Sequence, residues 1–234
     1  MLFNDFKEGL LGILFPDVCT VCGLKLASNE NFVCNRCLNE KFETANLEFK
    51  ISSSDIMLPE GVDLQHALWN FDKGGELQEL LHQLKYHRLT GVGEDIGRQL
   101  GKSLLQDPLF MQAINKQKVR LIPVPLHPKK RRLRGYNQAF FIAKGVAEAT
   151  GLHILDKEAV VRIRDTGTQT GFSTERRREN IRGAFEVKIP DAIKDTICVI
   201  IDDVFTTGAT TFEMASVLTE NGSAKILIAT VAQA

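Results

Sequence analysis

Residues 199–210 read VIIDDVFTTGAT, and this stretch decides the fold. Its apolar, β-branched start predicts a buried strand, which ends in two adjacent carboxylates, Asp202 and Asp203. A short loop of Thr and Gly follows, and the apolar spacing of residues 209–221 predicts a helix. The backbone N–H groups of such a loop and of the helix N-terminus form an anion site. The stretch therefore predicts a strand, an anion-binding loop and a helix within an α/β fold.

The side chains of this loop narrow the kind of ligand. Thr206, Thr207 and Thr210 add hydroxyl donors, and Gly208 lets the backbone approach a ligand closely. The loop contains no Lys, so it is not the phosphate loop of an NTPase. The carboxylates would repel a phosphate, but they fit the vicinal hydroxyls of a sugar, with or without a hydrated Mg²⁺. The set therefore predicts a site for a ribose 5-phosphate unit; the alternative is an ordinary strand, turn and helix with Thr caps.

Strands and helices alternate along the rest of the chain. Strands are expected at residues 66–71, 119–124, 160–163, 183–187, 196–201 and 225–231. Helices are expected at residues 76–87, 93–115, 137–149 and 209–221. Residues 97–103, GRQLGKS, resemble a nucleotide loop but lack its first Gly, so we interpret them as a helix face. The alternation predicts a mostly parallel sheet flanked by helices.

The N-terminal part of the chain carries four closely spaced cysteines, Cys19, Cys22, Cys34 and Cys37. Each Cys-x2-Cys pair can point two thiolates at one place, and two pairs complete a tetrahedral four-thiolate site. The spacing favours zinc, with disulfides or an iron–sulfur centre as alternatives. We expect a structural zinc, because all four ligand positions are filled and none is open for a substrate. A module this small buries too little apolar surface to fold alone, so the metal would supply its folding free energy.

The chain is expected to form two units. The first is an N-terminal helix and zinc ribbon in residues 1–50, and the second is a larger domain in residues 51–234, with a polar linker at 38–60. The apolar residues between 3 and 14 follow a helical period but are interrupted by charges, so a signal peptide is not expected. The cysteine pattern is typical of a reducing cytoplasm. No membrane span is expected, because no stretch approaches the roughly 18 apolar residues that one needs.

Charge is distributed unevenly, although Lys and Arg balance Asp and Glu at 29 each. Residues 116–182 contain 16 Lys and Arg against 6 Asp and Glu, and the rest of the chain has the opposite excess. A basic segment in a neutral chain suggests a local anion site and argues against a uniformly basic coat for nucleic acid. The alternative is that these charges lie on solvated faces of ordinary helices.

The apolar run, the two acidic residues and TTGxT resemble the signature with which type I phosphoribosyltransferases bind 5-phosphoribosyl-1-pyrophosphate (PRPP). The resemblance implies a type I phosphoribosyltransferase fold for residues 51–234, with Mg²⁺ bound together with PRPP. It also implies catalytic roles for Asp202 and Asp203. The PRPP-binding residues that it implies are Asp202, Asp203, Val204, Phe205, Thr206, Thr207, Gly208, Ala209 and Thr210.

Further segments narrow the resemblance to one family. Residues 132–139, RLRGYNQA, resemble the RxRGYNQA signature of ComF-type competence proteins. Residues 168–173, TQTGFS, with the Arg-rich stretch and GAF after them, are similar to a second signature of that family. The cysteine pairs and Leu84-Lys85-Tyr86 also match. Over nearly its whole length the chain resembles the ComF/ComFC group, which includes GntX-like proteins and joins a zinc ribbon to a phosphoribosyltransferase domain.

The resemblance assigns the basic segments to the pyrophosphate of PRPP. The Lys and Arg cluster at residues 129–134 follows a strand end, where it can neutralise a leaving pyrophosphate–Mg²⁺. Residues 164–178 resemble a flexible lid that closes over PRPP and excludes water. The expected pyrophosphate-binding and lid residues are Arg132, Arg134, Tyr136, Asn137, Gln138, Gln169, Thr170, Arg176 and Arg177. Solvated basic faces and an ordinary exposed loop are the alternatives.

Three hypotheses for function follow. The first is an enzyme that binds Mg²⁺–PRPP and transfers the phosphoribosyl group to an acceptor that the sequence does not name. The second is a protein of the competence machinery that binds single-stranded DNA through the basic segment or the zinc ribbon. The third is a PRPP sensor without turnover. We adopt the first for the molecular activity, with natural competence and DNA uptake as the context that the resemblance implies.

Overall fold

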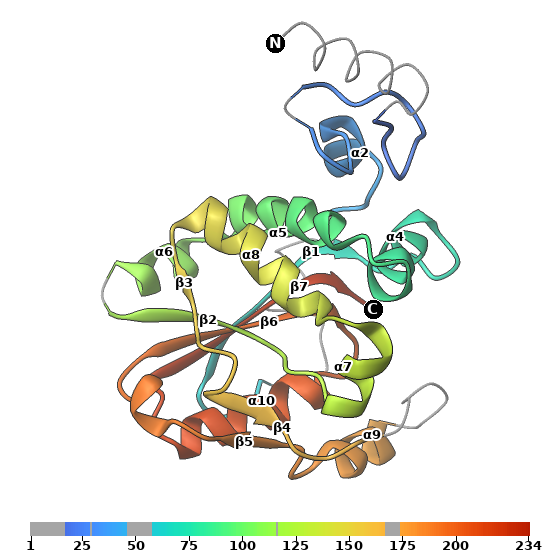
Figure 1. Ribbon diagram of the computed structural model, residues 1–234. Helices are drawn as coiled ribbons and strands as arrows, with labels where there is room; N and C mark the ends of the chain where they lie inside the picture. Colours follow the sequence, from blue (N-terminus) through green and yellow to red (C-terminus); the bar gives the residue numbers. More distant parts are fainter. Residues whose placement is uncertain (1–16, 29, 46–57, 116, 167–173) are drawn as a thin grey trace, which may run out of the picture.

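The centre of the protein is a five-stranded sheet in the order β1-β7-β6-β2-β3, in which all neighbouring strands are parallel (Figure 1). The computed structural model describes residues 17–28, 30–45, 58–115, 117–166 and 174–234. The strands are β1 (Val62–Asn70), β2 (Val119–Pro123), β3 (His153–Ile154), β6 (Ile197–Phe205) and β7 (Lys225–Gln233). The expected mostly parallel sheet is therefore confirmed, while the expected N-terminal helix lies outside the described residues.

Helices cover both faces of this sheet (Figure 1). One face carries α4 (Glu76–Tyr86), α5 (Thr90–Leu104), α6 (Pro108–Ile114) and α8 (Gln138–Thr150). The other face carries α10 (Ala209–Glu220) and an antiparallel ribbon of β4 (Val160–Arg162) and β5 (Phe185–Val187). The remaining elements are α2 (Asn35–Glu40), α7 (Pro128–Arg134), α9 (Thr174–Ile181) and a 3₁₀ turn at Pro190–Ala192. Among the helices that the structure describes, none is long and apolar enough to cross a bilayer.

The central strand β6 shows how one apolar run supports both layers. Val199 and Ile201 belong to the core under α5 and α8, and Cys198 and Ile200 belong to the core under α10. Successive side chains of a strand point to opposite faces, so a strand covered on both faces needs apolar residues throughout. Burial also raises the pKa of the Cys198 thiol to about 12, which keeps this cysteine protonated and unreactive.

Helices α5 and α8 approach each other through glycines. A Cβ at Gly97 of α5 would collide with the carbonyl oxygen of Ile142, and a Cβ at Gly145 of α8 would collide with the carbonyl oxygen of Glu94. The glycines therefore let two helix backbones touch. Residues 97–103 lie within α5, as expected for a helix face rather than a nucleotide loop.

The single helix expected over 93–115 is wrong, because two helices occupy this stretch. The first ends at Leu104, and Asp107 caps the second: its Oδ1 accepts hydrogen bonds from the backbone N–H of Leu109 at 2.9 Å and of Phe110 at 3.3 Å. Pro108 then occupies the first turn of α6. The other carboxylate oxygen of Asp107 lies 3.3 Å from the ring of the buried His66 on β1, so the break is anchored to the sheet.

The polar linker expected at 38–60 is also wrong for its first part. Residues 38–40 complete α2, and Thr44 forms an antiparallel bridge with Trp69 at the edge of β1. Phe42 packs against Trp69 with ring centroids 4.7 Å apart, so apolar contact outweighs the polar composition of the segment. The segment from 38 to 45 thus belongs to the cysteine module and covers a sheet edge. The predicted boundary near residue 50 falls in 46–57, outside the described residues.

Candidate active site and metal centre

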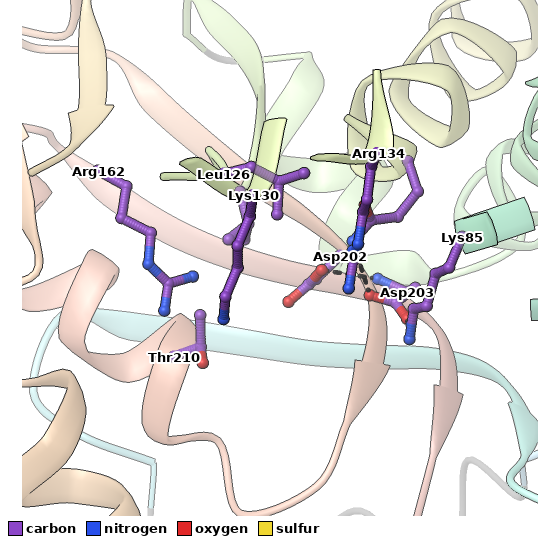
Figure 2. Close-up of a pocket in the computed structure, with 10 residues that line it drawn as sticks. Lys85, Leu126, Lys130, Arg134, Arg162, Asp202, Asp203 and Thr210 are labelled. Atoms are coloured by element: carbon purple, nitrogen blue, oxygen red, sulfur yellow. Dashed lines mark hydrogen bonds and ion pairs between the residues drawn. The ribbon is translucent and has the colours of Figure 1, made fainter. Parts of the chain in front are cut away.

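A pocket of about 190 Å³ lies at the carboxyl edge of the sheet, beside the end of β6 (Figure 2). Ligands of open α/β sheets bind at this edge. Segments that are far apart in the sequence line it: α4, the end of β2, α7, α8, β4, β6 and α10. The lining residues are Lys85, Val124, Leu126, Lys130, Arg134, Gln138, Arg162, Asp202, Asp203 and Thr210. Residues of the basic middle segment and the acidic pair therefore meet in space.

The two acidic residues lie within β6 rather than after it. The strand continues to Phe205, and Asp202, Val204 and Phe205 pair with β7. The backbone N–H of Ala234 donates to the carbonyl of Phe205 at 2.9 Å, which extends the strand further than expected. Because neighbouring strand residues face opposite sides, Asp203 points toward α4 and α8, while Asp202 points toward β4 and α10 (Figure 2).

Asp203 is buried and forms an ion pair with Lys85 from the last turn of α4. Gln138 adds a hydrogen bond from its Nε2 to Asp203 Oδ1 at 3.5 Å. Burial raises the pKa of Asp203, but Lys85 outweighs this and holds the pKa below its usual value. Burial in turn lowers the pKa of Lys85, while Asp203 and Asp202 raise it above its usual value. Asp203 is therefore a stably ionised carboxylate.

Asp202 has a different environment. Its carboxyl is half-buried and forms no ion pair within the described part of the chain. Its Oδ1 accepts the backbone N–H of Asp203 at 2.9 Å. Burial, followed by the negative charge of Asp203, raises the pKa of Asp202 well above its usual value. Asp202 therefore carries an incompletely compensated charge that a cation or sugar hydroxyls would stabilise.

The loop after β6 makes a tight turn and carries a polar group without a partner among the described residues. Gly208 adopts a φ of 72°, and a Cβ there would collide with the ring of Phe212. Thr207 Oγ1 is buried and has no hydrogen-bond partner within the described residues. Thr210 lines the pocket from the first turn of α10. Of the nine residues that the resemblance assigned to PRPP, the first four (202–205) belong to β6, and the ring of Phe205 packs on Phe212.

Residues 134–138 fix the opposite wall of the pocket. Arg134 lines the pocket, and its Nη1 donates to Gln138 Oε1 at 3.0 Å. The Tyr136 hydroxyl donates to the carbonyl of Leu84, which holds the end of α4 against this turn. Asn137 caps α8 and donates from Nδ2 to the carbonyl of Val124 at 2.9 Å. Tyr136 and Asn137 thus position the wall, whereas Arg134 and Gln138 face the pocket.

The four N-terminal cysteines form a separate cluster, in which the Sγ atoms of Cys19, Cys22, Cys34 and Cys37 all lie within 4.8 Å of one another. All five cysteines of the chain are in described segments, and each is a free thiol. The Sγ atoms of Cys22 and Cys34 are 3.8 Å apart. Zn–S bonds of about 2.3 Å give an S–S edge of about 3.8 Å in a tetrahedron. The cluster therefore fits a structural zinc ion.

Backbone donors also suit thiolate ligands in this cluster. The N–H of Cys34 donates to Cys19 Sγ at 3.3 Å, and the N–H of Cys37 donates to Cys34 Sγ at 3.4 Å. Burial raises the pKa of Cys19, but several such donors, with Cys34 N–H first among them, lower it to about 7. Burial raises the pKa of Cys34 and of Cys37, so a bound cation would be needed to stabilise all four thiolates together.

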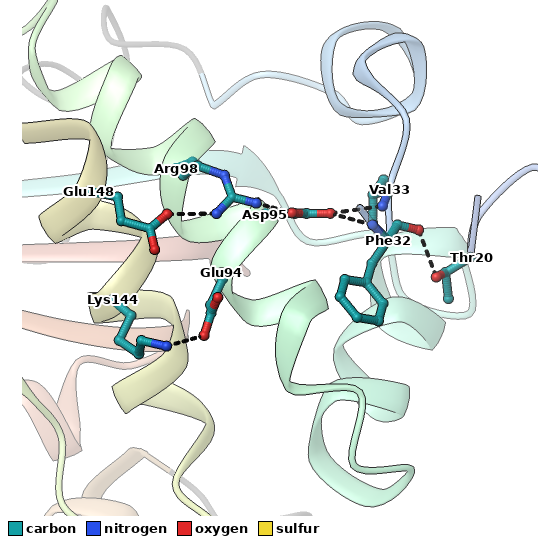
Figure 3. A network of polar contacts seen from close by, with 8 residues as sticks. All are labelled: Thr20, Phe32, Val33, Glu94, Asp95, Arg98, Lys144 and Glu148. Atoms are coloured by element: carbon teal, nitrogen blue, oxygen red, sulfur yellow. Dashed lines mark hydrogen bonds and ion pairs between the residues drawn. The ribbon is translucent and has the colours of Figure 1, made fainter. Parts of the chain in front are cut away.

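The cysteine module is attached to the larger domain through a buried carboxylate of α5 (Figure 3). Asp95 Oδ2 accepts the backbone N–H of Phe32 at 2.8 Å and of Val33 at 2.9 Å, immediately before Cys34. Asp95 also pairs with Arg98, whose Nη1 contacts Glu148 of α8 at 2.7 Å. The loop that carries Cys34 is therefore tied to two helices of the domain.

Asp95→Ala is expected to lower the free energy of unfolding by about 2–4 kcal/mol, because it leaves two inward-facing N–H groups without an acceptor. Glu148→Ala removes the exposed end of the same network and is expected to cost less than about 1 kcal/mol. Urea unfolding followed by the emission of Trp69 compares the two. Equal losses in both variants would contradict a special role for Asp95.

Comparison with known proteins supports the signatures seen in the sequence. No family model matches the chain. The DNA utilization protein YhgH of Salmonella typhimurium is 30% identical over 223 residues, which cover 91% of this chain and 95% of that protein. Competence protein F of Haemophilus influenzae is 32% identical over 115 residues, 49% of this chain and 50% of that protein. This chain belongs to the ComF family. The ComF-family protein ComFC of Streptococcus pneumoniae is 23% identical over 81% of this chain and 76% of its own length.

Solved structures add a weaker likeness. The PRPP amidotransferase of Bacillus subtilis is 19% identical and covers 59% of this chain, which spans about a quarter (26%) of that enzyme's length. Its TM-score of 0.37 is too low to carry a conclusion. The confirmed features of this ComF protein are thus the parallel, helix-flanked sheet and the four-cysteine cluster that its sequence predicted.

The pocket gathers only some of the residues that the ComF resemblance assigned. Asp202, Asp203, Thr210, Arg134 and Gln138 line it. Arg132 is exposed on α7 and is not among the lining residues, and neither is the exposed Arg176 of α9. Arg177 also belongs to α9, but its side chain lies outside the described part of the chain. Gln169, Thr170 and the centre of the lid fall outside the described residues, so the lid stays a prediction.

Two charged lining residues, Lys85 and Arg162, had no assigned site role in the sequence. Lys85 was noticed only as part of the Leu84-Lys85-Tyr86 match and Arg162 only as part of a strand, whereas Lys130 was assigned to the pyrophosphate with the cluster at 129–134. Charge alone does not distinguish them from solvated residues. The helical pattern of α4 places Lys85 next to the buried Leu84. Only the fold, however, brings its side chain to Asp203.

Proposed function

We propose that this ComF protein binds Mg²⁺–PRPP and transfers the phosphoribosyl group to an acceptor. The observation that carries the proposal is the pocket in which the carboxylates of β6 adjoin both the loop before α10 and a set of buried or partly buried cations. The backbone N–H groups of residues 206–210 are suited to a phosphate, and Asp202 and Asp203 are suited to the ribose hydroxyls. Lys85 and Arg134, beyond the acidic pair, are suited to the pyrophosphate.

The carboxylates also fit the metal ion that accompanies PRPP. Mg²⁺ prefers oxygen ligands and is usually held by one or two carboxylates together with substrate phosphates. Asp202 offers such an oxygen, because its half-buried carboxyl faces the pocket. When bound there, Mg²⁺ would neutralise the charge that develops on the pyrophosphate.

The chemistry would then be displacement at the anomeric carbon. The acceptor attacks C1 as the C1–O bond to pyrophosphate breaks, through an oxocarbenium-like transition state related to that of glycosidases. Asp202 and Asp203 hold the ribose hydroxyls and lend negative charge near the developing cation. Lys85 and Arg134 stabilise the departing pyrophosphate, which leaves with the bonding electron pair. Gln138 orients both sides, because it contacts Arg134 and Asp203.

Calorimetry with Mg²⁺–PRPP tests binding, and a screen of nucleobases with pyrophosphate release as the readout tests turnover. Saturable binding with release of pyrophosphate for at least one acceptor is expected. Binding without release in the whole screen would favour the alternative of a PRPP sensor. Absence of binding in the wild-type protein would overturn the proposal.

A second candidate function is the handling of single-stranded DNA, suggested by the names of the relatives and by one surface. Helix α7 carries Lys129, Arg131 and Arg132 with no acidic residue, and its Leu133 is 84% exposed. Such a basic and apolar surface fits a phosphate backbone with bases beside it. Gel-shift titration with single-stranded DNA should then show an affinity that falls steeply with salt. Lack of any shift at low salt would exclude this function.

A further inference from the structure

The cysteine module contacts both helices of the α4–α5 hairpin. The ring of Phe32, two residues before Cys34, lies against the first turn of α5, where a Cβ at Gly91 would collide with it (Figure 3). Lys41, which follows α2, pairs through its Nζ with Glu76 Oε1 at 2.8 Å in the first turn of α4. The module therefore touches the hairpin at the start of each helix.

Apolar packing joins the module to the same hairpin. Val33, Leu38 and Phe42 of the module belong to one continuous core that also contains Leu84 of α4 and Ile96 of α5. Protein interiors are close-packed, so a displacement on one side of a core is passed to the residues that it contacts. An ordered module therefore restricts the positions of both helices.

The turn between the two helices is strained. Arg88 adopts a φ of 59°, a left-handed conformation that is unfavourable for a residue with a side chain. Such a conformation persists only where the surrounding structure enforces it. Two contacts hold the flanks of this turn: Phe32 lies against Gly91, and the Tyr136 hydroxyl donates to the carbonyl of Leu84. The turn is thus held by the module as well as by the pocket wall.

The residue that reaches the pocket lies just before this turn. Lys85, in the last turn of α4, forms the ion pair with the buried Asp203 (Figure 2). An ion pair with a buried carboxylate is favourable only in close and well-oriented contact. A shift of the last turn of α4 would therefore withdraw the ammonium group from the pocket, and the module contacts both the start of this helix and the turn that ends it.

We propose that the metal-bound cysteine module fixes Lys85 in the pocket, because the order that a bound metal imposes on the module passes through Phe32 and the α4–α5 turn. Phe32 is then a positioning residue, which acts on the ligand only through Lys85. The inference rests on the proposed function for its ligand, since that function places the pyrophosphate at Lys85. Binding of Mg²⁺–pyrophosphate should thus depend on the metal in the module.

Calorimetry with two fragments of PRPP tests this dependence. Mg²⁺–pyrophosphate reports on the Lys85 side of the pocket, and ribose 5-phosphate reports on the loop at 206–210. Removal of the metal from wild-type protein is expected to weaken pyrophosphate binding by about 10-fold, the effect of one lost charge-assisted hydrogen bond, and to change ribose 5-phosphate binding by less than about 2-fold. In Lys85→Gln, pyrophosphate binding should be equally weak with and without the metal.

Variants with an intact cysteine cluster separate the Phe32 contact from the metal itself. Gly91→Ala introduces the Cβ that collides with the Phe32 ring, so it should retain zinc and still weaken pyrophosphate binding as metal removal does. In a Phe32→Ala background the new Cβ no longer meets a ring, and Gly91→Ala should have no further effect. Arg36→Gln changes an exposed Arg that pairs within α2, and this control should bind both fragments as the wild-type protein does.

The outcomes distinguish the inference from the proposed function. If wild-type protein binds pyrophosphate equally well with and without the metal, the inference is wrong and the proposed function stands. Equal weakening of both fragments would show a general loosening of the domain and would also overturn the inference. If neither fragment nor PRPP binds, the proposed function is wrong, and hydrogen exchange of residues 76–88 decides the inference. Faster exchange in the metal-free protein, with β6 unchanged, supports it, and equal exchange overturns it.

Discussion

Asp202→Asn is expected to abolish measurable Mg²⁺–PRPP binding and, at the same time, to raise the unfolding temperature. The loss should reach about 100-fold or more, because a carboxylate that accepts two hydroxyls or a metal bond contributes charge-assisted contacts. The gain in unfolding temperature has an electrostatic cause. Burial and the charge of Asp203 raise the pKa of Asp202 in the folded protein, so its ionised form destabilises the fold at neutral pH.

The sign of the pH dependence follows from this shift. The folded protein holds the Asp202 proton more tightly than the unfolded chain, so stability falls as the pH rises from the usual Asp pKa through the raised one. Ligand affinity changes in the opposite direction, because the ionised carboxylate is the form that binds. In Asp202→Asn, both slopes should disappear. Thermal unfolding and calorimetry over this pH range measure them.

Asp203→Asn is the matched control at the next position of the same strand. It also removes a carboxylate from the pocket, but it leaves Lys85 without its ion-pair partner. A broken pair of this kind costs stability, here about 1–3 kcal/mol since Lys85 is partly exposed. The two variants should therefore both lose ligand affinity while their unfolding temperatures move in opposite directions. If both variants lowered stability equally, the assignment of the two carboxylates would be wrong.

Site residues that are contiguous in the sequence could be predicted, whereas residues that only the fold brings together could not. The strand, the acidic pair, the loop and α10 are contiguous, so local patterns alone defined them. Lys85, Lys130 and Arg162 lie in three other elements, and only the strand order brings those elements to the end of β6. The sequence neighbours of a single charged residue in a helix or strand do not show whether its side chain lines a pocket or points into solvent.

The errors in the fold have a similar origin. The Asp107-Pro108 pair was a local signal for a new helix, but the apolar spacing around it suggested one continuous helix. The segment from 38 to 45 is polar in composition, yet Phe42 decides its position by packing on Trp69. A short segment with one large apolar residue can be ordered by a tertiary contact that its composition does not reveal. The lid remains a prediction, since its centre is not described.

The cysteine module provides the second large effect, since its folding is expected to depend on metal. Wild-type protein should contain about one zinc per chain, and removal of the metal or the change Cys34→Ser should unfold the module. The module buries few apolar residues of its own, whereas the binding of structural zinc supplies about 10–16 kcal/mol in small zinc domains. The sheet should persist, because its two cores lie mostly among residues after 58.

Trp69 reports this transition without a label. It is the single tryptophan of the chain, is 2% exposed, and is covered by Phe42 of the module. Loss of zinc should therefore shift its emission to longer wavelength while far-ultraviolet circular dichroism keeps most of its helical signal. Cys198→Ser, a change of the buried cysteine outside the cluster, should retain zinc and the native emission maximum. Metal-free protein with native Trp69 emission would show that the module folds without zinc, and the cysteine cluster would then need another explanation.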